Sequence, residues 1–206
     1  MKKKEFNYYI VIFVIIILLF LTLLLEDKMG SRIVTILTVG TAIVGAVSIF
    51  IQYKRDKEVN QASFILEYAK YFYSLNGVEE AMLLLDQYRL GNKEAIKKLN
   101  YMGVINYLFW CEELAALYQK NVVDIESIDN LFSYLFFLIT NNEYIQETEL
   151  CPQAEFYKGT FYLHKVWTKY KKDTHQPIIN EKESLEKVKE YQKIAQKGDL
   201  SNRKLY

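Results

Sequence analysis

Two long apolar runs near the start of the chain dominate its pattern of hydrophobic and polar positions. They cover residues 8–25 and 33–51, and neither contains a charged residue. About 18–20 apolar residues at 1.5 Å per residue cover the roughly 30 Å hydrocarbon core of a bilayer. Neither run has the polar stripe of a surface helix, and only residues 26–32 separate them. The pattern therefore predicts a transmembrane helical hairpin.

The first run could instead be a cleaved signal peptide. Against this, its apolar stretch exceeds a typical signal-peptide core, no small-residue cleavage site follows, and a second run comes directly afterwards. Three basic residues precede the first run and three follow the second: Lys2, Lys3, Lys4, Lys54, Arg55 and Lys57. Because basic flanks stay in the cytoplasm, we expect an uncleaved hairpin with both termini cytoplasmic.

The second run differs from the first in its small residues. Thr41, Gly45 and Ser48 recur at i, i+4 and i+7, so they share one helix face. Small residues at this spacing let two helix backbones approach closely. Three interpretations stay open: packing against the first run, packing between subunits of a homo-oligomer, or lining a pore. An ion or proton relay is disfavoured, because neither run contains an ionisable residue.

The rest of the chain has helical periodicity with short breaks, and we expect an all-α fold. The predicted helices cover residues 56–75, 78–90, 92–99, 100–121, 125–140, 153–172 and 181–197. Gly77, Gly91 and the pair Asn141-Asn142 break the pattern, and Asp124 can cap the helix that follows it. Helix 100–121 is apolar nearly all round, which is typical of the central helix of a bundle. Helix 181–197 has a thin apolar stripe, which predicts a surface helix.

These elements suggest four segments. We expect a two-span transmembrane anchor over residues 1–52, a juxtamembrane stalk helix over 53–75, a cytoplasmic helical bundle over 76–172, and a charged C-terminal loop and helix over 173–206. The formal net charge of +1 hides an acidic middle and a basic tail. Residues 58–157 hold 6 basic and 15 acidic groups, whereas residues 158–206 hold 12 basic and 6 acidic groups. Opposite-charge contacts between neighbouring subunits are therefore possible.

Histidines are the first candidates for catalysis, and the chain has two, His164 and His175. A HEPN ribonuclease needs an Arg and a His about four to six residues apart, so that a cation and an acid/base group meet at one phosphate. Here Lys158 and Lys169 occupy the corresponding positions, and Lys lacks the bidentate fork that grips phosphate. We therefore expect His164 to be a bundle histidine and His175 an exposed loop residue.

Other chemical signals are weak. Glu112 and Glu113 are the one carboxylate pair inside an apolar helix, but helix neighbours point about 100° apart, so Glu113 is expected to be a buried glutamate hydrogen-bonded to Tyr or Lys. Cys111 and Cys151 fit no metal spacing, and a cytoplasmic disulfide is not expected. The 17 tyrosines at helical spacing are typical of a core, although they permit nucleic-acid binding. No catalytic, cofactor-binding or metal-binding residue is assigned.

Four pieces of the chain carry a family resemblance: YKRDKEVNQASFILEY, INYLFWCEELAALYQKNVVDIESIDNLFSYLF, NNEYIQETELCP and FYKGTFYLHKVW. The chain resembles a family of uncharacterised bacterial membrane proteins, defined by a domain of unknown function, with an N-terminal membrane anchor and a helical cytoplasmic domain. The resemblance covers roughly residues 40–171. It implies an association with mobile or phage-defence loci. A more distant resemblance is to membrane accessory proteins of RNA-targeting CRISPR systems, which contain a degenerate HEPN-like bundle and form oligomeric pores.

We therefore expect a membrane-anchored helical interaction or effector module without catalysis of its own, in bacterial anti-phage defence. The alternatives are a degenerate HEPN-like RNA-binding or RNA-cleaving membrane protein, or an oligomeric membrane pore. The expected partners are the lipid bilayer, further copies of the chain and a protein of a defence system, and no cofactor is expected.

Overall fold

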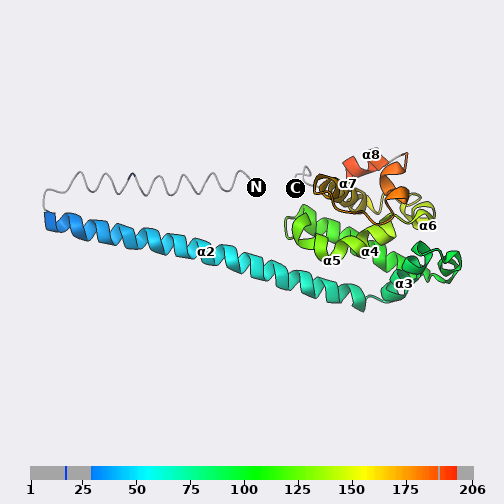
Figure 1. Ribbon diagram of the computed structural model, residues 1–206, viewed down its shortest axis with the longest axis horizontal. Coiled ribbons are helices and arrows are strands. Elements are labelled where there is room, and N and C mark those ends of the chain that lie inside the picture. The colour runs from blue at the N-terminus through cyan, green and yellow to red at the C-terminus, as the bar shows by residue number, and fades with distance from the viewer. Residues whose placement is uncertain (1–16, 18–28, 190, 199–206) are drawn as a thin grey trace. The chain divides into compact units, whose positions relative to one another are not determined.

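The computed structural model describes residue 17, residues 29–189 and residues 191–198, without the side chains of residues 29–37 and of residue 57 (Figure 1). Every regular element in this part of the chain is helical, so the predicted all-α class is confirmed. The chain divides into two compact units, Met1–Asn60 and Gln61–Tyr206. The second unit is the helical bundle.

Helix α2 (Met29–Ser74) contains residues of both units. In the first unit several of its apolar side chains are exposed, among them Val44 (65%), Ile49 (68%) and Ile51 (60%). In the second unit Ile65, Tyr68 and Phe72 are buried in the bundle. From Ile65 onward, the segment predicted as a stalk contributes to the bundle core.

The predicted transmembrane hairpin falls largely outside the described residues. Of its first run, residues 8–25, only residue 17 is described, and the second run begins among side chains that are not described. Within the part of the chain that the structure covers, no helix has both the length and the apolar character needed to cross a membrane. The two-span anchor stays a prediction.

A glycine turn joins α2 to α3 (Val78–Arg89), as the sequence indicates. Gly77 has φ +75°, a left-handed conformation that favours glycine. Gly103, in the first turns of α4 (Tyr101–Gln119), lies directly against the backbone of Gly77, so a Cβ atom at position 103 would collide with the Gly77 carbonyl. Two glycines thus permit this close contact between the α2–α3 turn and α4.

The next elements follow the predicted boundaries within a few residues. A 3₁₀ helix, η1 (Lys93–Lys98), connects α3 to α4, and the Asn100 side chain caps α4 by accepting from the Met102 N–H at 2.9 Å. Helix α5 (Ile125–Thr140) has the predicted bounds. Its N-cap is Asp124, whose carboxylate accepts from the Ser127 N–H at 2.8 Å, which confirms the predicted cap.

Helix α4 is central to the bundle, as its apolar circumference predicts. Its buried residues include Tyr107, Leu108, Trp110, Cys111 and Leu114. The Trp110 ring is fully buried among four aromatic rings, with centroid distances from 4.7 to 6.2 Å. These rings belong to Tyr68, Phe72, Tyr107 and Phe132. Aromatic packing therefore joins α2, α4 and α5 into one core.

Between α5 and α7 the chain folds less regularly than the sequence suggests. Helix α6 (Glu143–Ile145) passes into a short π-helix, η2 (Gln146–Leu150), and turns follow. Helix α7 (Lys158–Asp173) begins five residues after the predicted start at 153. The reason is a cap from another helix, since the Glu112 carboxylate of α4 binds the first backbone N–H groups of α7.

The C-terminal segment corrects one prediction. Instead of a single surface helix over 181–197 there are three short helices, η3 (Glu181–Glu183), η4 (Leu185–Lys187) and α8 (Tyr191–Lys197). Leu185, Tyr191 and Ala195 are almost fully buried, and α8 contacts α7. The thin apolar stripe underestimated the burial of this segment because it assumed one helical period over residues 181–197. Where the helix is broken, apolar side chains at other spacings can also face the core.

Candidate functional site

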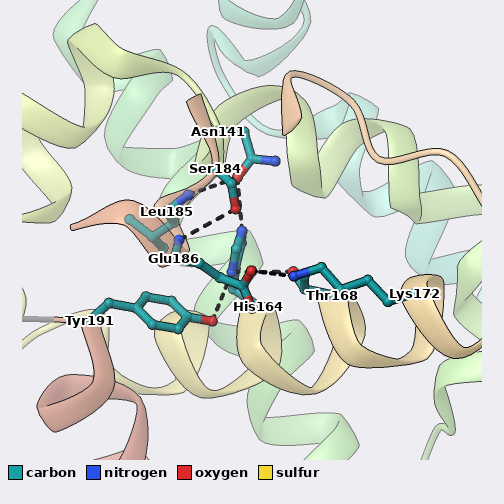
Figure 2. Close-up of polar contacts among 8 residues, drawn as sticks. All are labelled: Asn141, His164, Thr168, Lys172, Ser184, Leu185, Glu186 and Tyr191. Carbon is teal, nitrogen blue, oxygen red and sulfur yellow. Dashed lines mark hydrogen bonds and ion pairs between the residues drawn. The ribbon is translucent and has the colours of Figure 1, made fainter. Parts of the chain in front are cut away.

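His164 is fully buried in α7 and lies among polar groups from three other segments (Figure 2). Its Nε2 lies 2.8 Å from Oδ1 of Asn141, and its Nδ1 lies 3.0 Å from the hydroxyl of Tyr191. Thr168, one turn along α7, places Oγ1 at 3.5 Å from the same Nδ1. Both ring nitrogens are therefore occupied by groups of the bundle.

Asn141 determines the tautomer of His164. The Asn141 Nδ2 donates to the Ile179 carbonyl at 2.8 Å, and its Oδ1 accepts from the Leu185 N–H at 3.2 Å. Because Oδ1 is an acceptor, His164 must carry its proton on Nε2, and Nδ1 accepts from the Tyr191 hydroxyl. Through these bonds the two residues fasten the C-terminal segment to α7.

The charge state of His164 follows from its surroundings. Burial, with a smaller effect from the positive charge of Lys172, lowers the pKa of His164 to about 3. The imidazole is therefore neutral at physiological pH and lies far from the pKa near 7 that suits a general acid or base. The expectation of a bundle histidine is confirmed.

Among the described residues, no hydrogen bond joins the lysine and the histidine of either pair considered as a ribonuclease remnant. Lys158, at the start of α7, forms an ion pair with Glu155, and neither nitrogen of His164 contacts it. His175 is exposed and adopts φ +55° in the turn after α7, as expected for a loop residue. Lys169 is also exposed on α7.

The adjacent glutamates Glu112 and Glu113 lie in different surroundings. Glu112 is the bound carboxylate: its oxygens accept from the N–H groups of Gly159 at 2.8 Å and Thr160 at 2.7 Å, and from the Thr160 hydroxyl at 2.9 Å. A Cβ atom at position 159 would lie 2.6 Å from the Glu112 Oε1, so any side chain there would displace the capping carboxylate. Glu113 is exposed, which corrects its predicted burial, whereas the predicted hydrogen bond to a tyrosine is present, with Tyr71 as the donor. The rotation of about 100° between helix neighbours separates them.

A buried ion pair was missed at the sequence level. Asp129 on α5 and Lys171 on α7 are each 5% exposed, and Lys171 Nζ lies 2.8 Å from the carboxylate. The Trp167 Nε1 donates to the same carboxylate at 2.7 Å, and Gln176 accepts from Lys171 at 2.7 Å. An Asp inside an apolar helix was the available signal, but its partner lies 42 residues away. The pair is hydrogen-bonded throughout, as a buried charge requires.

A groove of about 390 Å³ opens between α2 and α4, within the second unit. It is lined by Tyr71, Leu75, Asn106, Phe109, Trp110, Glu112, Glu113 and Ala116. We call it the acidic groove, because its only charged lining residues are the two glutamates. Burial and the neighbouring Glu113 carboxylate raise the pKa of Tyr71. The Nε1 of Trp110 is buried and has no hydrogen-bond partner among the described residues.

Metal and thiol chemistry have little support in the residues described. In that part of the chain no three His, Cys, Asp or Glu side chains gather as metal ligands would. Cys111 is buried in the core, and burial raises the pKa of its thiol. A buried, protonated thiol is a packing residue more than a nucleophile.

Comparison with known proteins gave no match among family models, curated proteins or solved structures.

Proposed function

We propose that this chain is a membrane-anchored helical interaction module of the bacterial inner membrane. One observation carries the proposal. Helix α2 presents exposed aliphatic side chains from Val44 to Ile51 and then enters the core of the bundle at Ile65. Exposed apolar surface of this extent is typical of a membrane or protein contact. The uncharged stretch 33–51 in the sequence favours lipid as that contact.

The state of His164 favours interaction over catalysis. A ribonuclease of the HEPN type would need an accessible histidine beside a phosphate-binding cation, whereas His164 is buried, neutral and bonded at both nitrogens. The geometry therefore gives the RNA-cleaving alternative no support. The pore alternative rests on the small-residue face of α2.

Membrane insertion can be tested with the full chain carrying a topology reporter after Tyr206. Alkaline phosphatase activity reports a periplasmic C-terminus, and green fluorescence reports a cytoplasmic one. We expect a cytoplasmic C-terminus. Replacing Val44 and Val47 together by Lys costs roughly 5–7 kcal/mol of insertion free energy and should move the reporter to the periplasm.

A matched control is Val59→Lys, since Val59 is exposed on the same helix but lies beyond the apolar run. It should leave the topology unchanged. Carbonate extraction of membranes completes the test, because a peripheral protein would be released. A wild-type chain in the soluble fraction would contradict the anchor.

The resemblance extends the proposal to anti-phage defence and to a homo-oligomer as the working form. The defence role is tested by the plating efficiency of a panel of phages on cells that express the chain. Lys substitution of Val44 and Val47 should remove any protection, because the module would lose its place at the membrane. Equal plating on expressing and empty-vector cells across the panel would count against this role.

A further inference from the structure

The acidic groove has the features of a docking surface. Two of its aromatic side chains are exposed, Tyr71 at 41% and Phe109 at 50%. Of its two carboxylates, Glu112 is used to cap α7. Glu113 is exposed, accepts a hydrogen bond from the Tyr71 hydroxyl, and has no cationic partner among the described residues. The groove therefore offers apolar walls and one available negative charge, which together suit a cation on an apolar stem.

The same bundle carries a complementary surface on α7. Lys165, Lys169 and Lys172 recur at i, i+4 and i+7, so they lie on one face of the helix, and we call them the basic stripe. Lys172 pairs with Glu186 at 2.6 Å, whereas Lys165 and Lys169 have no acidic partner within 4.0 Å among the described residues. Partly exposed Val166 and Tyr170 lie beside the stripe.

The lengths of the basic stripe and of the acidic groove along their helices are compatible. The basic stripe covers seven residue steps of helix, or about 10 Å. The α4 wall of the groove covers the ten steps from Asn106 to Ala116, or about 15 Å. The basic stripe is therefore shorter than the α4 wall of the groove.

We propose that the acidic groove of one copy receives the basic stripe of a second copy. This inference rests on the proposed function, because it names the contact through which the module assembles. The Lys169 ammonium pairs with Glu113, and its stem lies against the rings of Tyr71 and Phe109. The two surfaces differ, so the contact is heterologous, and each copy offers one surface to each of two neighbours.

Charge exchange tests the contact in the full chain purified in mild detergent. We expect Glu113→Lys and Lys169→Glu each to weaken assembly about tenfold or more, because each places like charges together. The double variant restores an opposite-charge pair and should recover assembly. Mass photometry over a concentration series measures the dissociation, and raising salt from about 50 to 500 mM should weaken the wild type but not abolish its fold.

The matched control is Glu80→Lys, which reverses an exposed carboxylate on α3 outside the groove. It should assemble like the wild type. Circular dichroism checks that all variants are folded, and these residues are exposed, so folding should be unaffected. The idea is overturned if the single variants assemble normally, if the double variant stays dissociated, or if the wild type is a monomer.

These outcomes separate the inference from the proposed function. Carbonate extraction of the same variants reports the anchor alone. A membrane-bound monomer would overturn the groove contact and keep the anchor, whereas a soluble assembly sensitive to Glu113→Lys would do the reverse. If Lys169→Glu fails to restore the assembly of Glu113→Lys but a charge-reversed different protein binds that variant, the occupant of the groove is not a second copy.

Discussion

The two ends of helix α2 carry similar apolar side chains in opposite environments. Val44 and Ile49 are about two-thirds exposed, whereas Ile65 is buried and Phe72 is fully covered. The difference lies in what packs against them: α4 and α5 contribute aromatic rings to the second stretch. Burial is decided by the partner surface as much as by the hydrophobicity of the residue, so a helix can anchor at one end and belong to a core at the other.

The largest effect on stability should come from disrupting the aromatic core into which the C-terminal part of α2 packs. Trp110→Ala leaves a cavity among four aromatic rings and should lower the free energy of unfolding by about 3–5 kcal/mol. Val47→Ala, at the uncovered end, should change it by less than about 0.5 kcal/mol. Denaturant titration of the detergent-solubilised chain, followed by circular dichroism, measures both. Equal effects would mean that the two ends are not different in packing.

The next effect tests the charged part of the bundle core. Lys171→Met keeps the side-chain volume but leaves Asp129 buried without its cation, and we expect a loss of about 3 kcal/mol. Replacing both residues, Asp129→Leu with Lys171→Met, removes the unpaired charge and should regain most of that loss. The same titration applies. If the single and double variants are equally unstable, the ion pair is not what makes Lys171 necessary.

Acid should loosen the C-terminal segment through His164. An unfolded histidine titrates near 6.5, whereas the buried His164 has a pKa of about 3, so the unfolded state binds more protons between these values. Stability therefore falls as the pH drops below 6.5, by roughly 2 kcal/mol between pH 7 and pH 5.

The control for this effect is His164→Gln, which cannot titrate but retains a donor and an acceptor. Unfolding at a series of pH values should show a shallower slope for the variant, with the carboxylates contributing equally to both proteins. Parallel slopes would indicate that another group dominates the acid sensitivity.

Local signals predicted most of the fold. Gly77, Asp124 and the bounds of α5 follow from turn and capping chemistry, which acts within a few residues. The start of α7 was wrong because its cap, Glu112, comes from another helix about 47 residues earlier. The sequence near the start of α7 gives no indication of a cap from a distant helix.

The candidate sites show the same limit. The sequence indicated that His164 belongs to the bundle, since no arginine stands near it, but Asn141 and Tyr191 emerge as its partners only after the chain folds. The acidic groove combines residues of α2 and α4 that are 31 to 45 positions apart in the sequence. The charge blocks hinted at opposite surfaces, but not at which residues form them.

The smallest effect on the stability of the bundle should come from Gly45→Leu, in the part of α2 whose side chains are exposed. A Cβ atom at Gly45 meets no atom within 4 Å in the described part of the chain, so the leucine has room within one copy. Leucine also has the better helix propensity. The free energy of unfolding of the bundle should therefore change by less than about 0.5 kcal/mol.

The same variant tests assembly through α2. If Thr41, Gly45 and Ser48 form a contact between subunits, the larger side chain separates the helix backbones and lowers the fraction of oligomer. Mass photometry of the variant beside the wild type measures this, and Gly45→Ala is the control that keeps a small residue. Because the interface would be apolar, its loss should not depend on salt, unlike the effect of Glu113→Lys. An oligomer of unchanged size in Gly45→Leu would assign assembly to the bundle alone.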